Sequence, residues 1–209
     1  MTIGLETRQV TTTINLRQNE DSEDSIIEGY ALKFNKPSDV LGGWVRFREI
    51  LDSNALEGAD VSNVVATFNH DQNQVLGRTG VNLDLEIDNI GLKFRVRPTD
   101  TQFARDLMTN IKAGVINQCS FAFTIPDEDG SEEWEDSTED GVDYTRTIRK
   151  IDHLYDVSVV TTPAYPDTEV TVGARSKALV ESLQKEPAWK QEKRDLLRKL
   201  NKKQLLKGI

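Results

Sequence analysis

The sequence predicts a mainly β fold of the α+β class, with one main helix in the body and a helical tail at the carboxyl end. About ten short segments rich in β-branched and aromatic residues are bounded by turn residues. One other segment of the body carries apolar residues at a helical spacing of four. The chain has 26 Lys plus Arg and 35 Asp plus Glu. Residues 174–209 contain 11 of the basic residues and 4 of the acidic ones, and the residues before them contain 15 basic and 31 acidic residues. The body is therefore either a β-barrel or a strand-rich α+β domain.

The first half of the body consists mainly of predicted strands, with a short helical turn through Ala55 and Leu56 that Asp52 or Ser53 would cap. Pro37 and the Gly42-Gly43 pair indicate a turn, and Asp88-Asn89 indicates a tight hairpin between the last two strands. The expected strands are residues 8–16, 25–34, 44–51, 63–70, 75–79, 81–87 and 91–97.

The second half contains the predicted helix, over residues 101–112. Phe103, Leu107 and Ile111 form its apolar stripe, and Gly114 follows where a C-terminal cap belongs. Three further strands are expected at residues 117–125, 144–151 and 154–160. Residues 127–140 hold nine acidic side chains, and we interpret them as a solvated loop joining paired strands at 121–125 and 144–151.

The tail differs in composition from the body, so we divide the chain into residues 1–173 and 174–209. Residues 176–183 and 189–206 are helix-forming sequence broken at Pro187. The positive charge of the tail is expected to contact an acidic partner or the acidic body itself.

Several classes of protein are not expected from the composition. No apolar run approaches the ~20 residues of a membrane span, and the first thirty residues lack the pattern of a secretory signal. The single cysteine, Cys119, cannot form an internal disulfide and agrees with a reducing cytoplasm. Metal-ligand spacing is missing from the sequence, so neither a metal nor a cofactor is expected. The acidic body argues against binding to nucleic acid.

His70 is the residue around which the predicted chemistry is built, because it stands where an apolar strand ends and a polar run begins. Histidine takes and returns a proton near neutral pH. Ser120 is a candidate nucleophile on the face of its strand opposite Cys119, Phe121 and Phe123. The orienting group is either Asp156, which lies between apolar residues and so needs a partner, or His153.

Five blocks of sequence between residues 29 and 172 carry a resemblance to a known family. They are WVRFREIL with Asn54-Ala55-Leu56, FNHD, Leu76-Gly77-Arg78-Thr79, CSFAF and LYDVSVVTTPAYPDTEV. In this order and spacing they resemble the head-maturation (prohead) proteases of tailed bacteriophages, which are similar in fold to the herpesvirus assembly proteases (assemblin).

The resemblance implies a herpesvirus-protease-like β-barrel that acts as a serine endopeptidase. Carried over by motif, the family's histidine falls on His70 and its serine on Ser120. The third member falls on Asp156, where many members have glutamate; His153 is the alternative, because herpesvirus enzymes use a second histidine. Arg146 and Arg149 either assist the developing charge or, as we favour, pair with the acidic segment.

Family membership would also imply partners and a location. Such an enzyme is packaged inside the procapsid, in the host bacterial cytoplasm, and cleaves segments of the major capsid protein or scaffold protein. A terminal extension is removed by self-cleavage or targets the enzyme to the shell, and the relatives also suggest a homo-oligomer. The alternative function is a non-catalytic capsid-assembly or scaffold-binding protein on the same fold; a host β-barrel unrelated to capsids is a third reading.

Overall fold

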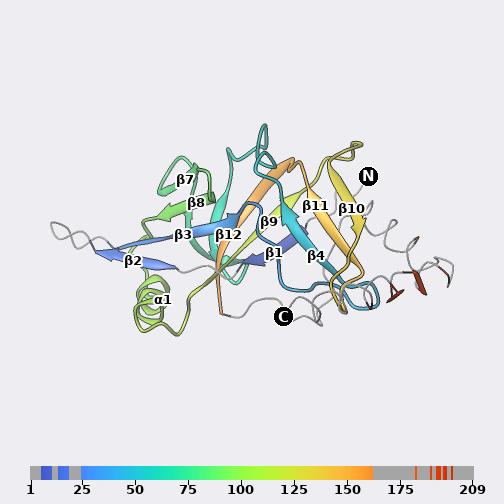
Figure 1. The fold of residues 1–209 in the computed structure, drawn as a ribbon. Coiled ribbons are helices and arrows are strands. Elements are labelled where there is room, and N and C mark those ends of the chain that lie inside the picture. Colours follow the sequence, from blue (N-terminus) through green and yellow to red (C-terminus); the bar gives the residue numbers. More distant parts are fainter. Residues whose placement is uncertain are drawn as a thin grey trace.

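The computed structural model describes residues 6–10, 14–18 and 25–161, together with single positions between 182 and 199. Within these residues, twelve strands form three sheets, and the body carries one helix. In Figure 1, the sheet that contains β9 and β12 occupies the middle of the molecule, with β4, β10 and β11 at one end and β2, β3, β7, β8 and α1 at the other.

The five-stranded sheet holds the residues of interest, and β12 is its central strand. β12 runs antiparallel to β9 and parallel to β5. The strand order is β1-β9-β12-β5-β6, with bounds β1 Glu6–Val10, β9 Gln118–Thr124, β12 His153–Val160, β5 Val65–Phe68 and β6 Asp71–Arg78.

The other two sheets flank this one. The four-stranded sheet has the order β2-β3-β8-β7, and the three-stranded sheet has the order β10-β11-β4. Their bounds are β2 Asn15–Gln18, β3 Ser25–Lys33, β8 Gly91–Val96, β7 Leu83–Ile87, β10 Glu132–Asp136, β11 Tyr144–Ile148 and β4 Phe47–Leu51.

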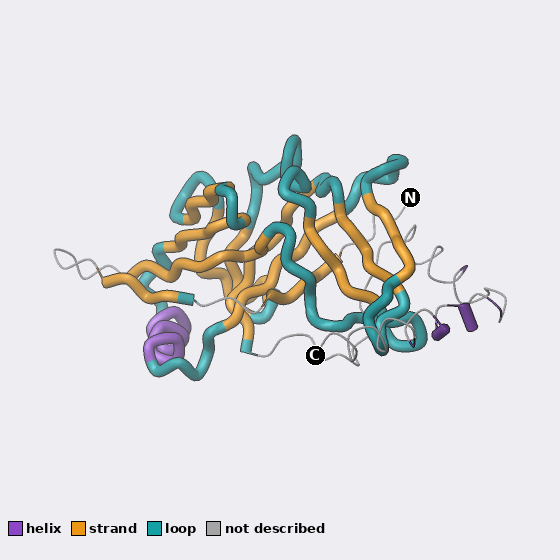
Figure 2. Tube along the Cα trace, viewed as in Figure 1, coloured by secondary structure: helices purple, strands orange, loops and turns teal. Residues whose placement is uncertain are grey.

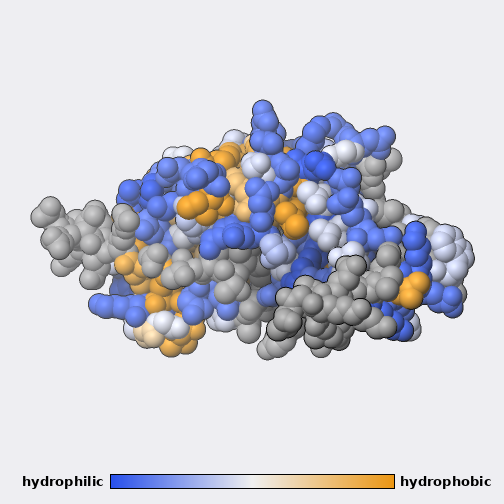
Figure 3. All heavy atoms as spheres, in the orientation of Figure 1, coloured by the Kyte–Doolittle hydropathy of each residue, from blue (hydrophilic) through white to orange (hydrophobic). Residues whose placement is uncertain are grey.

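The main core is shared by the five- and four-stranded sheets and by α1. Phe121 and Phe123 on β9 stack with ring centroids 5.2 Å apart, and Phe94 on β8 is buried with them. α1, Gln102–Lys112, packs Leu107 and Ile111 into the same core. Figure 2 shows this helix beneath one end of the strands. In Figure 3 most of the visible face is hydrophilic, and apolar residues gather at the end that carries α1, β7 and β8.

The helix confirms its sequence prediction at both ends. The Thr101 hydroxyl accepts a hydrogen bond from the N–H of Ala104 at 3.2 Å, which is a typical N-cap. Gly114 has φ +73°, and its N–H donates to the carbonyl of Ile111 at 2.9 Å. A residue with a Cβ is strained in this left-handed conformation, so glycine fits the position.

The mainly β prediction is confirmed, but a closed barrel is not. Within the described residues, the strands are divided among three sheets, and these sheets do not close into one hydrogen-bonded cylinder. One prediction combined two strands, because residues 8–16 include parts of β1 and β2, which belong to different sheets. The division at residue 174 lies outside the described residues, as do most residues of the two predicted tail helices.

The acidic segment 127–140 is not only a loop, and the prediction that the two strands it joins pair with each other was wrong. Residues 132–136 form β10, which pairs with β11, whereas β9 pairs with β1 and β12. The side chains of β10 alternate between exposed and partly buried positions, as in a strand. At the partly buried positions, Trp134 packs on Phe47 with ring centroids 4.8 Å apart, and Glu132 contacts the buried guanidinium of Arg146. A buried cation makes acidic residues favourable in this strand.

No helix among the described residues is long and apolar enough to cross a membrane.

Candidate active site

His70 lies in the two-residue turn between β5 and β6. Asn69 and His70 have φ values of +52° and +58°, while Phe68 and Asp71 pair across the turn. Two successive residues in the left-handed region are typical of a type I′ hairpin turn, where asparagine is favoured. We expected His70 to continue the strand and residues 71–74 to end it; instead the strand ends at Phe68, and β6 begins at Asp71.

The turn is attached to the end of β12 by three hydrogen bonds. The N–H of Asn69 donates to the carbonyl of Val159 at 2.9 Å, and the N–H of Thr161 donates to the Asn69 side-chain oxygen at 3.0 Å. The N–H of His70 donates to Ser158 Oγ at 2.9 Å. These bonds fix the backbone of His70 relative to the strand that carries Asp156.

The structure brings His70, Ser120 and Asp156 into one hydrogen-bonded line. His70 Nε2 lies 2.6 Å from Ser120 Oγ, and His70 Nδ1 lies 2.6 Å from Asp156 Oδ1. β12 lies between β5 and β9, so the three side chains come from three neighbouring parts of one sheet. An ionised carboxylate only accepts hydrogen bonds, so Nδ1 carries the proton and Nε2 is free to accept the Ser120 proton.

Burial in the line increases away from the imidazole. The His70 side chain is 24% exposed, the Asp156 side chain 5%, and Ser120 is fully buried. A buried carboxylate beside a partly exposed imidazole suits general base catalysis. The imidazole must exchange protons, while the carboxylate keeps it oriented.

Two hydroxyl residues that the sequence did not single out also belong to this cluster. The Thr67 hydroxyl contacts Asp156 Oδ2, and Thr67 Oγ1 lies 3.1 Å from Ser158 Oγ. Both residues are buried, at 0% and 1% exposure. A signal for them was present: each is a polar residue inside an otherwise apolar strand, and Ser158 shares strand parity with Asp156.

The alternative third residue, His153, lies elsewhere. It stands at the start of β12, with Nδ1 2.8 Å from Asp152 Oδ2 and Nε2 3.4 Å from Asp60 Oδ2, and its ring stacks on Tyr155. The pKa of Asp60 is lowered, chiefly by hydrogen bonding from Ser62. The residue that contacts His70 is therefore Asp156 rather than His153.

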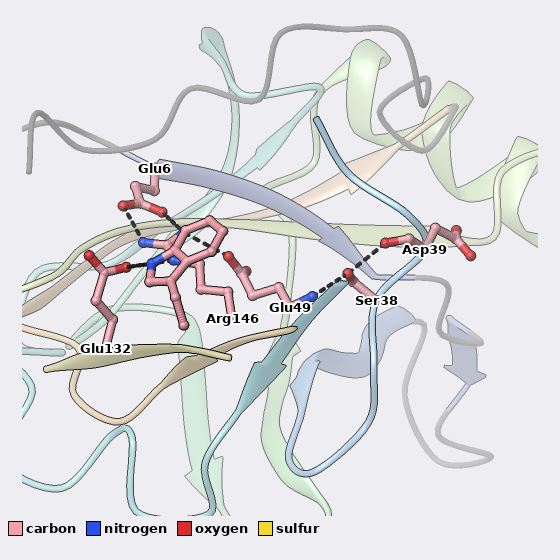
Figure 4. Close-up of polar contacts among 7 residues, drawn as sticks. Glu6, Ser38, Asp39, Glu49, Glu132 and Arg146 are labelled. Carbon is pink, nitrogen blue, oxygen red and sulfur yellow. Dashed lines mark hydrogen bonds and ion pairs between the residues drawn. The ribbon is translucent and has the colours of Figure 1, made fainter. Parts of the chain in front are cut away.

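Arg146 and Arg149 pair with the acidic segment, as we favoured. Arg149 contacts Glu133 on the surface. Arg146 Nε lies 2.7 Å from Glu132, and its Nη1 contacts Glu6 and Glu49 at 2.7 and 2.8 Å. Figure 4 shows these carboxylates converging on the Arg146 guanidinium.

In the described part of the chain, no group of three or more His, Cys, Asp or Glu is arranged to hold a metal ion. The chemistry that the cluster can perform is activation of the Ser120 hydroxyl by His70. This is the arrangement of hydrolases that form an acyl-enzyme.

Comparison with known proteins identifies the family and a similar fold. A family model described as caudovirus prohead serine protease matches residues 12–183. Among solved structures, the bacteriophage T4 capsid assembly protease gp21 superposes with a TM-score of 0.50 at 14% identity, over 78% of this chain and 100% of that one. At this identity the likeness concerns the fold. No curated protein matches the sequence.

Proposed function

The chain belongs to the caudovirus prohead serine protease family, and from this membership we propose that it is a serine endopeptidase of head maturation. Its substrates are segments of the scaffold protein or major capsid protein, cleaved inside the procapsid in the host cytoplasm. The observation that carries the proposal is the line from Ser120 Oγ through His70 to Asp156, with both contacts at 2.6 Å.

In the proposed mechanism, His70 Nε2 removes the proton of Ser120 Oγ as the oxygen attacks the scissile carbonyl. Asp156 keeps the His70 proton on Nδ1 and stabilises the imidazolium that forms. The imidazolium then donates its Nε2 proton to the leaving amine, and an acyl-enzyme remains on Ser120. Water, activated by the same imidazole, releases the acid product and restores the Ser120 hydroxyl.

Self-cleavage of the basic tail is part of the proposal. Residues 174–209 carry 11 Lys plus Arg against 4 Asp plus Glu, so their removal would leave an acidic enzyme. The proposed substrates are the partner chains and the tail itself, so the enzyme should be tested as the full chain together with its partners.

The decisive experiment is co-expression of the full chain with the major capsid and scaffold proteins of the same phage, followed by intact-mass spectrometry of every chain. The wild type, Ser120→Ala and His70→Ala are compared with Ser131→Ala. Ser131 is a matched control, because its buried Oγ has no hydrogen-bond partner in the part of the chain that the structure describes.

We expect truncated partner chains or a truncated tail with the wild type and Ser131→Ala, and intact chains with the other two variants. Removing a triad serine or histidine lowers kcat by about 10⁶-fold in a serine protease. Identical masses in all four samples, with the proteins still assembling, would instead identify a non-catalytic capsid-assembly or scaffold-binding protein.

A further inference from the structure

The hydrogen bonds around His70 form a closed ring that leaves from its imidazole and returns to its own backbone. The ring runs from His70 Nδ1 to Asp156 Oδ1, from Asp156 Oδ2 to the Thr67 hydroxyl, from Thr67 Oγ1 to Ser158 Oγ, and from Ser158 Oγ to the His70 N–H. We propose that Thr67 and Ser158 are positioning residues, which hold Asp156 and His70 in register for proton transfer. This proposal rests on the proposed function.

The donor and acceptor roles around the ring are consistent. The Asp156 carboxylate only accepts, so the single Thr67 proton is donated to Oδ2. Ser158 Oγ accepts from the His70 N–H. Because the Thr67 proton goes to Asp156, Ser158 is the donor in its 3.1 Å contact with Thr67 Oγ1, and the carbonyl oxygens of Thr67 and Val159 lie 3.2 and 3.3 Å from the same hydroxyl. Every member therefore has a partner, and each oxygen of Asp156 has a fixed donor.

The strand arrangement explains why these two hydroxyls meet. Thr67 on β5 and Ser158 on β12 are directly opposite in a parallel pair. Ser158 is also opposite Ser120 in the antiparallel pair with β9. The register that places the nucleophile therefore also places the hydroxyl that holds the His70 backbone.

The ring compensates for the unusual backbone of His70. At φ +58°, a residue with a Cβ is strained, and the bond from the His70 N–H to Ser158 Oγ is one of the three that hold this turn on β12. A misplacement of about 1 Å can lower a catalytic rate by about 100-fold. The side-chain hydrogen bonds of Thr67 and Ser158 run to Asp156, to each other and to the His70 backbone, so they would act on the rate through Asp156 and His70.

The first test replaces the Thr67 hydroxyl by a methyl group of the same shape. We expect Thr67→Val to lower kcat by about 10- to 100-fold, as is typical for residues that orient a reacting group, with KM unchanged. Thr67→Ser keeps the hydroxyl and should restore most of kcat. The matched control is Thr124→Val in β9, which removes a buried hydroxyl that has no hydrogen-bond partner among the described residues. This control should cleave like the wild type.

A second test examines whether the ring acts as a unit. Ser158→Ala removes the acceptor of the His70 N–H, and we expect a loss of kcat similar to that of Thr67→Val. Either change opens the ring, so the double variant should lose no more than about the larger single loss. If the fold-losses in kcat of the two single variants multiply in the double variant, Thr67 and Ser158 act independently. That result would overturn the proposal that the ring acts as a unit.

A third readout does not depend on activity. In proton NMR of the full chain, the His70 Nδ1–H should give a low-field resonance in the wild type, Ser120→Ala and Thr124→Val, and should shift or vanish in Thr67→Val. Cleavage within twofold of the wild type by folded Thr67→Val, or an unchanged resonance, would overturn the positioning role. If Ser120→Ala still cleaved while the resonance responded as expected, the proposed function would fail and the ring would stand.

Discussion

Buried carboxylates form two clusters in different parts of this protein, and the nitrogen bases that they contact differ in what they can do. In the first, Asp156 is paired with the His70 imidazole, which is partly exposed and can lose its proton. In the second, Glu6, Glu49 and Glu132 surround Arg146, which is completely buried (Figure 4). The guanidinium does not deprotonate in proteins.

The electrostatics of the second cluster reinforce this difference. Burial by itself lowers the pKa of Arg146, but the carboxylates of Glu49 and Glu6 outweigh burial and raise the pKa above its ordinary value. Glu6 is on β1 and Arg146 on β11, so the cluster joins the five-stranded sheet to the three-stranded sheet. The charge of Arg146 is fixed and holds the two sheets together, whereas the His70 imidazole can take up and release a proton. The mobile proton, rather than burial, therefore distinguishes the candidate active site.

The largest effect that separates the clusters is expected from Asp156→Asn. The amide can still fill the site and bond to Thr67, so the fold should remain, but it does not hold the His70 proton on Nδ1. Cleavage should fall by about 10⁴-fold, as in a triad that loses its carboxylate. The rate of partner truncation, measured by intact mass, checks the loss, and the thermal midpoint checks the fold. A loss below tenfold would contradict the role of Asp156.

The next effect concerns stability and should appear with Arg146→Met. This change leaves the buried carboxylates of Glu6, Glu49 and Glu132 without their central cation, which costs about 3–5 kcal/mol of the free energy of unfolding. Urea denaturation measures it. Arg146→Lys keeps a positive charge but not the planar donors, so it should lose less. A loss under about 1 kcal/mol in Arg146→Met would mean that the cluster does not hold the two sheets together.

A smaller effect tests the turn that delivers His70. Asn69→Ala places a β-carbon without a polar side chain at φ +52° and removes the bond to Thr161, so unfolding should become easier by about 1–2 kcal/mol. Asn69→Gly relieves the backbone but also lacks the bond, and it separates the two contributions. If both variants match the wild type in thermal unfolding, the turn is not under the constraint inferred from its φ angles.

The smallest effect is expected on the surface, where Arg48 and Glu139 form an ion pair of the same residue types as Arg146 and its glutamates. The Arg48 and Glu139 side chains are 28% and 49% exposed. Glu139→Gln should therefore cost only about 0.2–1 kcal/mol, and less at high salt. The hydrogen bond from Arg48 lowers the pKa of Glu139. The contribution should thus be present above the usual glutamate pKa and disappear as pH falls through the lowered one.

The pH dependence of denaturation for wild type and Glu139→Gln provides the measurement. The two curves should converge in acid and separate towards neutral pH. If Glu139→Gln lowered the free energy of unfolding as much as Arg146→Met does, burial would not determine the strength of these ion pairs.

Local pattern in the sequence predicted a large part of the structure. The stripe of Phe103, Leu107 and Ile111 placed α1, and the β-branched segments placed most strands within a few residues. The carboxylate of Asp156 in an apolar strand indicated that it needs a partner. These predictions succeeded because they depend on spacing along one short segment.

Pairing between distant segments was not accessible in this way. β10 was mistaken for a loop, because its acidic residues look solvated until Arg146 from another strand is placed beside them. The Thr67 and Ser158 hydroxyls were overlooked for the same reason, since their contacts join residues 91 positions apart.

The sequence by itself determined that this is a strand-rich chain with one body helix, and it supplied a histidine, a serine and an aspartate in motifs that resemble those of prohead proteases. Only the tertiary structure decided that Asp156 and not His153 contacts His70. It also decided that the strands form three separate sheets and that Arg146 is buried among three glutamates. The physical reason is that hydrogen-bond direction and charge burial depend on the register between strands. Register is determined by packing across the whole molecule rather than by any single segment.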